Sequence, residues 1–265
     1  MNQARQPLSL IAETVLQKAA LDQGFDIEMG ERNGWLHFES TQTPVALALT
    51  ADDTGGWIAA LSSQTVVAEL NRTERRASVT PPAGTMAAFT MPSAAALHVL
   101  LRRARMLGRA LPTRPLEQFT ERAGTLPRTT EAERLVVQRV GQNIFRDALL
   151  EYWNGRCPLT GIDEPLLLRA SHIKPWAACT DDAERLDVYN GLLLATHLDA
   201  AFDAGLISFD NEGRVMVSLK LSAHNRACLD LDSLPPLELS KRHQIFLAWH
   251  RRDVMPKCTD VSRPQ

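Results

Sequence analysis

Histidine, asparagine and aspartate side chains gather in one stretch of this 265-residue chain. His172 ends an apolar run, Asn190 follows it, and Asp199 and Asp203 come shortly afterwards. A neutral imidazole accepts a proton from water near neutral pH, and carboxylates hold hard divalent cations. Such a cation polarises a phosphoryl oxygen and stabilises the oxygen that leaves. These groups are what hydrolysis of a phosphodiester requires, and the rest of the sequence has no comparable cluster.

Two short strands are expected to carry the first of these groups. Alternation over 166–172 puts His172 on the same side of a strand as three apolar residues. Asn190 and Gly191 predict a hairpin turn, because both residues tolerate a positive φ. The apolar run Leu192–Leu194 predicts the second strand. A histidine at the end of an apolar strand is more often a hydrogen-bonded structural residue, so His172 taken alone would carry no function.

A short helix is expected to carry the acidic pair. Thr196 predicts its N-cap, and Gly205 predicts its end after residues 197–204. Asp199 and Asp203 are four residues apart and therefore share one helical face, one turn from each other. The order strand, turn, strand and helix is thus expected to bring the strand-end imidazole opposite the two carboxylates.

Four motifs in this region occur in a specific order. They are Cys157–Gly161, Ala170–Trp176, Asn190–Leu194 and His197–Asp210. Each motif is weak alone, but the ordered set resembles the HNH nuclease superfamily, in particular its restriction-like branch. The resemblance covers roughly residues 130–255 and implies a ββα-metal fold with nuclease activity. The first half of the chain resembles no family that we recognise.

The resemblance implies a role for each matching side chain. His172 matches the general base that takes a proton from water, and Asn190 matches the residue that fixes the loop and the base through hydrogen bonds. The helix that follows supplies metal ligands in this superfamily, often as histidines. Here Asp199 and Asp203 occupy those places, while His197 lies two residues earlier than Asp199.

The expected cofactor is a divalent cation. Carboxylate ligands favour magnesium or manganese, whereas an imidazole in the coordination shell would also admit zinc or nickel. Ser171 stands where the superfamily often has a further ligand, and it is a poor one. No structural zinc is expected, because the four cysteines form no CxxC pair. Lys174 is expected to contact phosphate, although a surface lysine is an equally good interpretation.

Composition places the chain among ordinary globular proteins. At 265 residues, with 45% hydrophobic and 23% charged residues, it is long enough for two domains with real cores. No apolar run approaches the roughly 20 residues that span a bilayer, and no secretory signal is visible. We therefore expect no membrane partner and a cytoplasmic location, in which the dispersed cysteines stay reduced. The net charge of −2 argues against nonspecific coating of nucleic acid.

Positive charge is nevertheless concentrated between residues 100 and 130. This segment holds seven arginines and only two glutamates. Arg102, Arg105 and Arg109 belong to it and would contact the DNA backbone. A solvated helix face is the alternative interpretation, and both stay open.

The fold class predicted by these patterns is α+β, with a small N-terminal α+β domain over 1–110. Prolines and a glycine predict an irregular linker over 111–129. A long helix capped at Thr129 or Thr130 opens the nuclease domain with its flanking helices, 130–255, and 256–265 is a tail. The N-terminal helices are predicted over 8–23, 64–70 and 93 to about 107, and the strands over 25–29, 35–39, 45–50 and 57–61.

These expectations lead to a metal-dependent DNA endonuclease of a restriction or defence system. The N-terminal domain would choose the target, although no helix-turn-helix or zinc finger is recognisable in it, and two copies would cut the two strands. Two alternatives stay open. One is a DNA-binding module that keeps the scaffold without catalysis, which Ser171 and the altered ligands motivate. The other is a toxin-like nuclease that cuts RNA.

Overall fold

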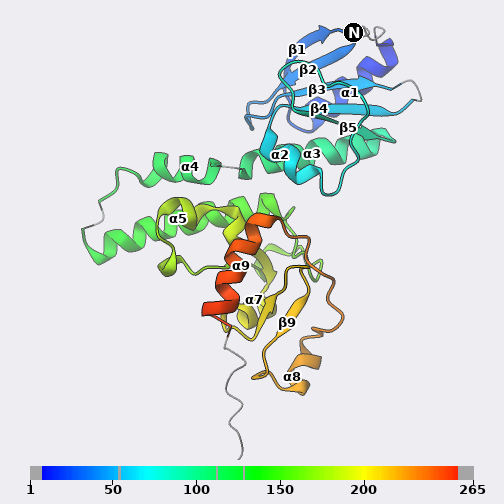
Figure 1. Cartoon of the computed structure of the whole chain (residues 1–265). Helices are drawn as coiled ribbons and strands as arrows, with labels where there is room; N and C mark the ends of the chain where they lie inside the picture. The colour runs from blue at the N-terminus through cyan, green and yellow to red at the C-terminus, as the bar shows by residue number, and fades with distance from the viewer. Residues whose placement is uncertain (1–7, 53–54, 112, 128, 256–265) are drawn as a thin grey trace, which may run out of the picture. The chain divides into compact units, whose positions relative to one another are not determined.

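The computed structural model describes residues 8–52, 55–111, 113–127 and 129–255. Contacts within the chain divide it into two compact units, Met1–Pro112 and Thr113–Gln265, each a mixture of helices and strands (Figure 1). The α+β class predicted from the sequence is confirmed. The expected tail, 256–265, lies outside the described residues. None of the described helices combines the length and the apolar character needed to cross a membrane.

The first unit is built on one antiparallel sheet whose five strands pair in sequence order. Helices α1 and α3 pack against strands of this sheet and against each other. The predicted strands over 35–39 and 57–61 and the predicted helix over 64–70 have the same bounds in the structure. The elements of this unit are α1 (Leu10–Asp22), β1 (Ile27–Arg32), β2 (Trp35–Glu39), β3 (Leu47–Ala51), β4 (Trp57–Leu61), α2 (Gln64–Leu70), β5 (Ala87–Met91) and α3 (Ala94–Ala110).

Strand β5 is an element that the sequence does not predict. Its sequence contains two alanines, which are depleted in strands, so its order comes from tertiary pairing with β4. Ala60 of β4 pairs with Ala88 of β5 and also with Ala48 of β3. Ala77 and Val79 pack over this row of small side chains, and the Ala77 N–H donates to the Ala88 carbonyl at 2.9 Å.

The second unit combines helices with two short strand pairs, β6 with β7 and β8 with β9. Its elements are α4 (Arg114–Ala123), α5 (Glu131–Tyr152), β6 (Leu168–His172), α6 (Asp182–Leu186), β7 (Gly191–Ala195), α7 (Thr196–Asp203), β8 (Ile207–Phe209), β9 (Val215–Val217), α8 (Ala223–Cys228) and α9 (Lys241–Asp253), with the 3-10 turns η1 (Pro165–Leu167), η2 (Trp176–Ala178) and η3 (Val188–Asn190).

Helix α4 occupies part of the segment that was expected to be an irregular linker, and that expectation is wrong there. Pro115 lies in the first turn of the helix, where a proline breaks no helical hydrogen bond. Phe119 and Ala123 are buried. A Cβ on Gly141 of α5 would lie 2.4 Å from the ring of Trp176 and 3.3 Å from the ring of Phe119, so this glycine leaves room chiefly for Trp176.

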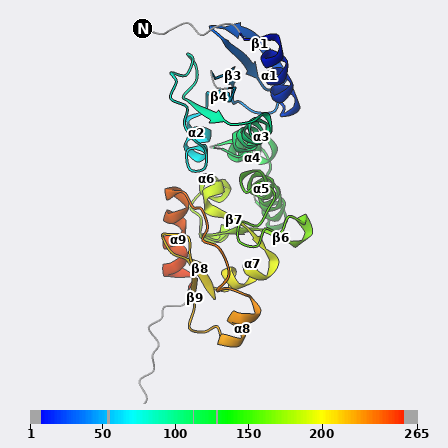
Figure 2. The ribbon, with the colours of Figure 1, turned by 90° about the vertical axis from the view of Figure 1, so that its right-hand side faces the viewer.

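Helix α5 is the long helix predicted from residue 130 onward. Thr130 and Glu133 form a reciprocal capping box at its start, which satisfies N–H groups that have no partner inside the helix. Helices α5 and α7 lie on either side of the strand pair β6–β7 (Figure 2). The strand pair therefore has a helix on each face.

The tight turn predicted at Asn190 and Gly191 is wrong. Strand β6 does pair with β7, from Leu168 opposite Ala195 to His172 opposite Gly191, but residues 173–190 form a long connection between them. Gly191 has φ −145°, so it needs no left-handed backbone. A glycine is required at position 191 for a different reason, because a Cβ there would lie 2.5 Å from the ring of Phe145.

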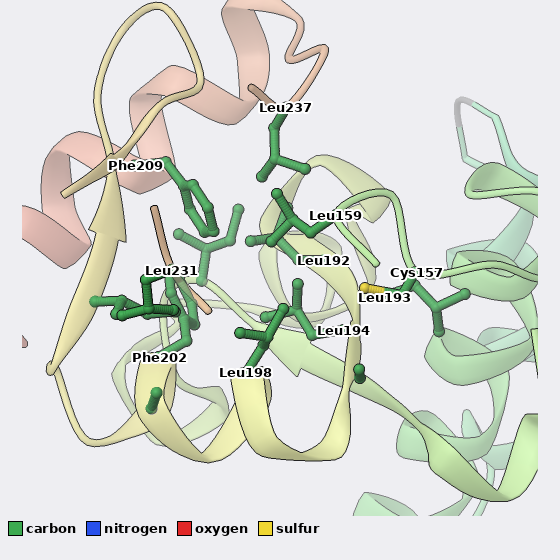
Figure 3. Packing of buried hydrophobic residues seen from close by; sticks show 14 of the residues in the cluster. Cys157, Leu159, Leu192, Leu193, Leu194, Leu198, Phe202, Phe209, Leu231 and Leu237 are labelled. Carbon is green, nitrogen blue, oxygen red and sulfur yellow. The ribbon is translucent and has the colours of Figure 1, made fainter. Parts of the chain in front are cut away.

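One hydrophobic core holds the strand pair, α7 and the C-terminal elements together (Figure 3). Leu192, Leu193 and Leu194 of β7 are all completely buried. Leu198 and Phe202 anchor α7 from its inner face, which leaves Asp199 and Asp203 on its outer face. The helical periodicity of the sequence predicted this division correctly.

His250 of α9 ties this core to the end of α7. It is 1% exposed, and its ring stacks on the ring of Phe202 at 3.9 Å between centroids. Nε2 lies 3.1 Å from the Phe202 carbonyl, and Nδ1 lies 3.1 Å from the Ser208 hydroxyl. Because a carbonyl only accepts, Nε2 carries the proton and Nδ1 accepts from Ser208. The last turn of α7 is therefore held by a neutral histidine.

We predict that His250→Gln flattens the pH dependence of folding stability. Burial holds the pKa of His250 at about 4 in the folded state, against about 6.5 in the unfolded chain. The unfolded state therefore takes up the proton first, so this contribution is complete above pH 6.5 and is lost as the pH falls towards 4. It amounts to roughly 1–3 kcal/mol of unfolding free energy. Urea unfolding at pH 7.5, 6.0 and 5.0 measures the unfolding free energy, with the exposed His224→Gln as control. If the unfolding free energies of wild type and His250→Gln fall equally between pH 7.5 and pH 5.0, the prediction is contradicted.

Candidate active site

Asn190 is fully buried and holds the connection between β6 and β7 in place. Its Oδ1 accepts the N–H of Lys174 at 2.8 Å, and its Nδ2 donates to the carbonyls of Lys174 at 3.1 Å and Glu184 at 3.2 Å. Its own carbonyl accepts the N–H of Ile173 at 2.9 Å. One residue thus ties the start of the connection to a point near its end. Movement of this loop would leave buried polar groups unsatisfied, which is costly.

His172 is held in one tautomer by this loop. Its Nε2 lies 2.9 Å from the Arg185 carbonyl, and because a carbonyl only accepts, Nε2 carries the proton and Nδ1 keeps the lone pair. The ring stacks on Phe145 of α5 at 3.8 Å and meets the edge of Trp176 at 5.6 Å. Burial lowers its pKa to about 4, although the hydrogen bond to Arg185 acts in the opposite direction. The imidazole is therefore neutral at pH 7 and able to accept a proton at Nδ1.

Arg185 fixes the carbonyl on which His172 depends. Its guanidinium donates to the carbonyls of Trp176 at 3.2 Å and Cys179 at 2.8 Å, and it forms an ion pair with Asp182 at 3.0 Å. Asp187, two residues further along, pairs with Arg242 of α9 at 2.7 Å and not with Arg185.

Asp199 and Asp203 lie together on the outer face of α7, as their spacing predicts. The hydroxyl of Ser171 donates to Asp203 Oδ1 at 3.3 Å, so the acidic pair lies beside the end of β6. Partial burial raises the pKa of both carboxyl groups, and the negative charge of Asp199 raises that of Asp203 further. A hydrogen bond from Ser171 and the positive charge of Arg169 act in the opposite direction on the pKa of Asp199, but the effect of burial is larger and the net shift is upward. Two carboxylates that repel one another are stabilised by a cation between them.

The donor set fits a hard cation better than a soft one. Among the described residues, no three or more His, Cys, Asp or Glu side chains are grouped so that they would hold a metal ion. Magnesium is bound in many enzymes by one or two carboxylates, with water and substrate phosphate completing its octahedral shell. Asp199 and Asp203, with the Ser171 hydroxyl beside them, match that pattern. They do not match a zinc site, which needs three or four protein ligands.

His197 is not brought to the acidic pair. It precedes Asp199 by two residues on α7, which places it about 200° around the helix axis, and it is exposed. The three-ligand set of His197, Asp199 and Asp203 is therefore not assembled in the described structure. A metal-binding role for His197 stays a prediction.

Lys174 is engaged inside the loop. Its Nζ lies 2.7 Å from Glu184 Oε1, and both side chains are largely buried. Glu184 also accepts the N–H of Thr180 at 2.7 Å. The structure thus gives Lys174 a loop-stabilising contact, and its predicted contact with phosphate is not evident in this arrangement.

The imidazole and the acidic pair are on different sides of β6. Ser171 contacts α7, whereas His172, one residue later, stacks on α5. This follows from the strand geometry, because successive side chains point to opposite faces. The expectation that the strand places His172 directly opposite the two carboxylates is therefore wrong. His172 is the last residue of β6, so the two sides of the strand meet at this end.

Arg169 is a residue of this region that sequence reasoning missed. It is exposed and lies two residues before Ser171, so it shares the α7 face of β6. Its Nη1 donates to the carbonyls of Leu166 and Leu168 at 3.1 Å, and its charge reaches Asp199. The period-two pattern that placed His172 among apolar residues would also have placed Arg169 with Ser171.

The three arginines predicted to bind nucleic acid all belong to α3 in the first unit. Arg102 and Arg109 are exposed. Arg105 donates to Gln42 at 2.8 Å, which gives it a structural role within its own unit. Their spacing of three and four residues places them near one face of the helix.

Comparison with known proteins agrees with the geometry of the second unit. Residues 157–210 match the sequence model of an HNH endonuclease family. This segment contains β6, β7 and α7 together with the loop that Asn190 holds. No curated protein matches the chain. The C-terminal half therefore carries a segment of the HNH endonuclease family, as its motifs indicated. Nucleases of this family generally use a divalent metal.

We predict that Asn190→Ala loosens the loop selectively. The substitution removes hydrogen bonds to residues 174 and 184 and leaves their buried partners unsatisfied, which costs about 2 kcal/mol or more. Amide hydrogen exchange should accelerate over residues 173–186 while the sheet β1–β5 keeps its protection. Asn225→Ala, in the exposed helix α8, serves as control. Unchanged exchange in the loop would show that Asn190 does not hold it.

Proposed function

We propose that this chain is a metal-dependent DNA endonuclease in which His172 is the general base and Asp199 and Asp203 hold one divalent cation. The observation that carries the proposal is the state of His172, which is neutral, fixed by the Arg185 carbonyl and left with its lone pair on Nδ1. The HNH endonuclease match over 157–210 supports the reaction class.

The chain's own residues supply most of the reaction. Nδ1 of His172 takes a proton from water as the water oxygen attacks phosphorus, and the bond from phosphorus to the 3′ oxygen breaks. The Arg185 carbonyl stabilises the imidazolium that results, because it already accepts the Nε2 proton. Arg169 is positioned to contact a phosphate oxygen beside Asp199. A magnesium or manganese ion, when bound to the acidic pair, would neutralise charge on the phosphoryl group and stabilise the leaving oxygen.

The position of the substrate follows from the two sides of β6. A phosphodiester that reaches both Nδ1 of His172 and the carboxylates of α7 would lie across the end of this strand. Ser171 lies at that end and contacts Asp203. Its small side chain leaves the two aspartates as the charged ligands at this position. In other HNH nucleases the residue just before the general base often binds the metal. Here the aspartates of α7 would bind it in place of Ser171.

The biological setting is a further part of the proposal. We propose a restriction or defence role in the cytoplasm, with target choice by the first unit through exposed residues of α3 such as Arg102 and Arg109. A homodimer would let two active sites cut the two strands. Digestion of unmodified, methylated and hydroxymethylated DNA with end-mapping tests the target choice. Light scattering on the DNA complex tests the dimer, and a monomer would refute it.

Two other functions are distinguishable by experiment. If wild-type protein binds DNA but cleaves none of these substrates with magnesium, manganese, zinc or nickel, it is a binding module that keeps the HNH scaffold. If it cleaves RNA in a parallel assay and leaves DNA intact, it is an RNA nuclease. The binding-module alternative is motivated by Ser171, a weak ligand where a carboxylate would complete the site.

We predict that His172→Gln lowers plasmid cleavage by about a hundredfold to ten-thousandfold, because it removes the proton acceptor. The glutamine amide is able to donate to the Arg185 carbonyl, so the fold should persist, which circular dichroism checks. His224→Gln on exposed α8 is the matched control and should cleave like wild type. Cleavage by His172→Gln at the wild-type rate would show that the assigned base is wrong.

We predict that Asp199→Asn and Asp203→Asn each weaken manganese binding by at least about tenfold, since a neutral amide replaces a charged ligand. Isothermal titration calorimetry without DNA measures this directly, so the result does not depend on cleavage. Asp253→Asn, an exposed aspartate of α9, should bind manganese like wild type. Wild-type affinity in both active-site variants would remove the acidic pair from the metal site.

A further inference from the structure

Asp187 lies at the junction where α6 ends and η3 begins. Its backbone is extended, with φ −69° and ψ 117°, so the helix does not continue through it. Its side chain is only 16% exposed, and a carboxylate withdrawn from water is costly unless its oxygens are paired. It follows Arg185, whose carbonyl accepts the Nε2 proton of His172, by two residues. The partners of this carboxylate therefore bear on the candidate base.

One oxygen of Asp187 takes the N–H group that would otherwise compete for the Arg185 carbonyl. In a continued α-helix a carbonyl accepts the N–H four residues later, which for Arg185 is that of Tyr189. Here the Tyr189 N–H donates to Asp187 Oδ1 at 3.0 Å. Arg185 is in the last turn of α6, where carbonyls have no partner within the helix. Its carbonyl is thus left to accept from Nε2 of His172 at 2.9 Å.

The backbone of Asp187 also holds the asparagine that closes the loop. Its carbonyl accepts the N–H of Asn190 at 2.8 Å, and Nδ2 of Asn190 donates to the Glu184 carbonyl at 3.2 Å. The carbonyls of residues 184 and 185 are therefore both used outside α6, one by Asn190 and the other by His172. Asp187 is the residue at which the chain leaves the helix and makes both of these bonds possible.

Arg242 of α9 fixes the second oxygen of this carboxylate. Its Nη2 donates to Asp187 Oδ2 at 2.7 Å, and its guanidinium lies over the ring of Tyr189 at 4.1 Å from the centroid. Burial raises the pKa of Asp187, whereas the Tyr189 N–H and the charge of Arg242 act in the opposite direction. The arginine thus supplies the counter-charge that a largely buried carboxylate needs.

Ring contacts attach η3 to two helices at the same place. Tyr189 is 4% exposed, and its ring meets the rings of Tyr152 of α5 at 5.6 Å and His243 of α9 at 5.1 Å, both edge-on. The ion pair therefore acts on a segment that is already packed, so it can set the direction of the chain there. Arg242 and His243 lie outside residues 157–210, which match the HNH endonuclease family.

We propose that Asp187 is a positioning residue for the base and that Arg242 holds it in place from α9, so that the Arg185 carbonyl stays available to His172. This inference rests on the proposed function, because it takes His172 as the base. It adds that a helix outside the matched segment determines the state of this base. Neither Asp187 nor Arg242 needs to contact the substrate.

The first test is nitrogen-15 NMR of His172 in the full chain, without metal or DNA. Asp187→Ala frees the Tyr189 N–H to bond the Arg185 carbonyl, so the two ring-nitrogen shifts should move towards each other as both tautomers become populated. Asp187→Asn keeps an oxygen that accepts from Tyr189 and should retain the wild-type shifts. Arg242→Gln should give a smaller change in the same direction. It should add nothing to Asp187→Ala, because the arginine acts through Asp187.

The second test separates positioning from binding. For plasmid cleavage by Asp187→Ala, kcat should fall about tenfold to a hundredfold, because the base is no longer held in its reactive geometry. KM for DNA and manganese affinity should stay at their wild-type values, and Asp187→Asn should recover most of the lost kcat. Arg252→Gln is the matched control. Its arginine pairs with Asp253 at an exposed position of the same helix, and the variant should match wild type in both tests.

The outcomes distinguish this proposal from the nuclease proposal. If Asp187→Ala lowers only the unfolding free energy and keeps the wild-type shifts and kcat, the residue is merely structural and the positioning role is refuted. If Asp187→Asn behaves like Asp187→Ala, or if Arg242→Gln acts equally with and without Asp187, the proposed pair is likewise refuted. If wild type cleaves nothing while the NMR changes occur as expected, the positioning of His172 stands and the nuclease proposal fails.

Discussion

The buried amide of Asn190 is the constraint on which the candidate site depends. Its side-chain hydrogen bonds join residue 174 to residue 184, its backbone carbonyl accepts the N–H of residue 173, and together these bonds close the connection between β6 and β7. Closure places the Arg185 carbonyl against Nε2 of His172, and the carbonyl then determines which ring nitrogen is protonated. Because the side chain is fully buried, each of these bonds is costly to break. The chemistry of a half-buried histidine is therefore set by an asparagine that need not contact substrate.

The second unit divides its functional groups between the two faces of one strand pair. Helix α5 supports the imidazole through Phe145, and helix α7 carries the two carboxylates beside Ser171. The stacked and hydrogen-bonded His250 fixes the end of α7. In the proposed mechanism this separation would keep the imidazole away from the cation, which would otherwise compete with a proton for the ring lone pair.

The sequence predicts local features well and spatial relations less well. The helix with Asp199 and Asp203 on one face, its end at Gly205 and the long helix from residue 130 all follow from periodicity and caps. The roles of Gly191 and Arg185 do not, because one depends on the position of Phe145 and the other on the path of a folded loop. The separation of Ser171 from His172 follows in principle from the period of two, whereas the order strand, turn, strand and helix predicts the imidazole opposite the carboxylates. Helix α4 shows the same limit of local reasoning. Prolines in 111–129 predict irregular structure, yet Pro115 lies in the first turn of α4, where a proline is compatible with a helix.

The state of His172 is the claim that a single measurement tests most directly. Nitrogen-15 NMR of histidine-labelled protein, assigned with His172→Gln, reports which ring nitrogen is protonated and at what pH the ring titrates. The account predicts a neutral ring at pH 7 with the proton on Nε2, and a pKa far below 6.5, near the value of about 4 that burial imposes. A ring protonated on Nδ1, or one that becomes an imidazolium near pH 6.5, would contradict it.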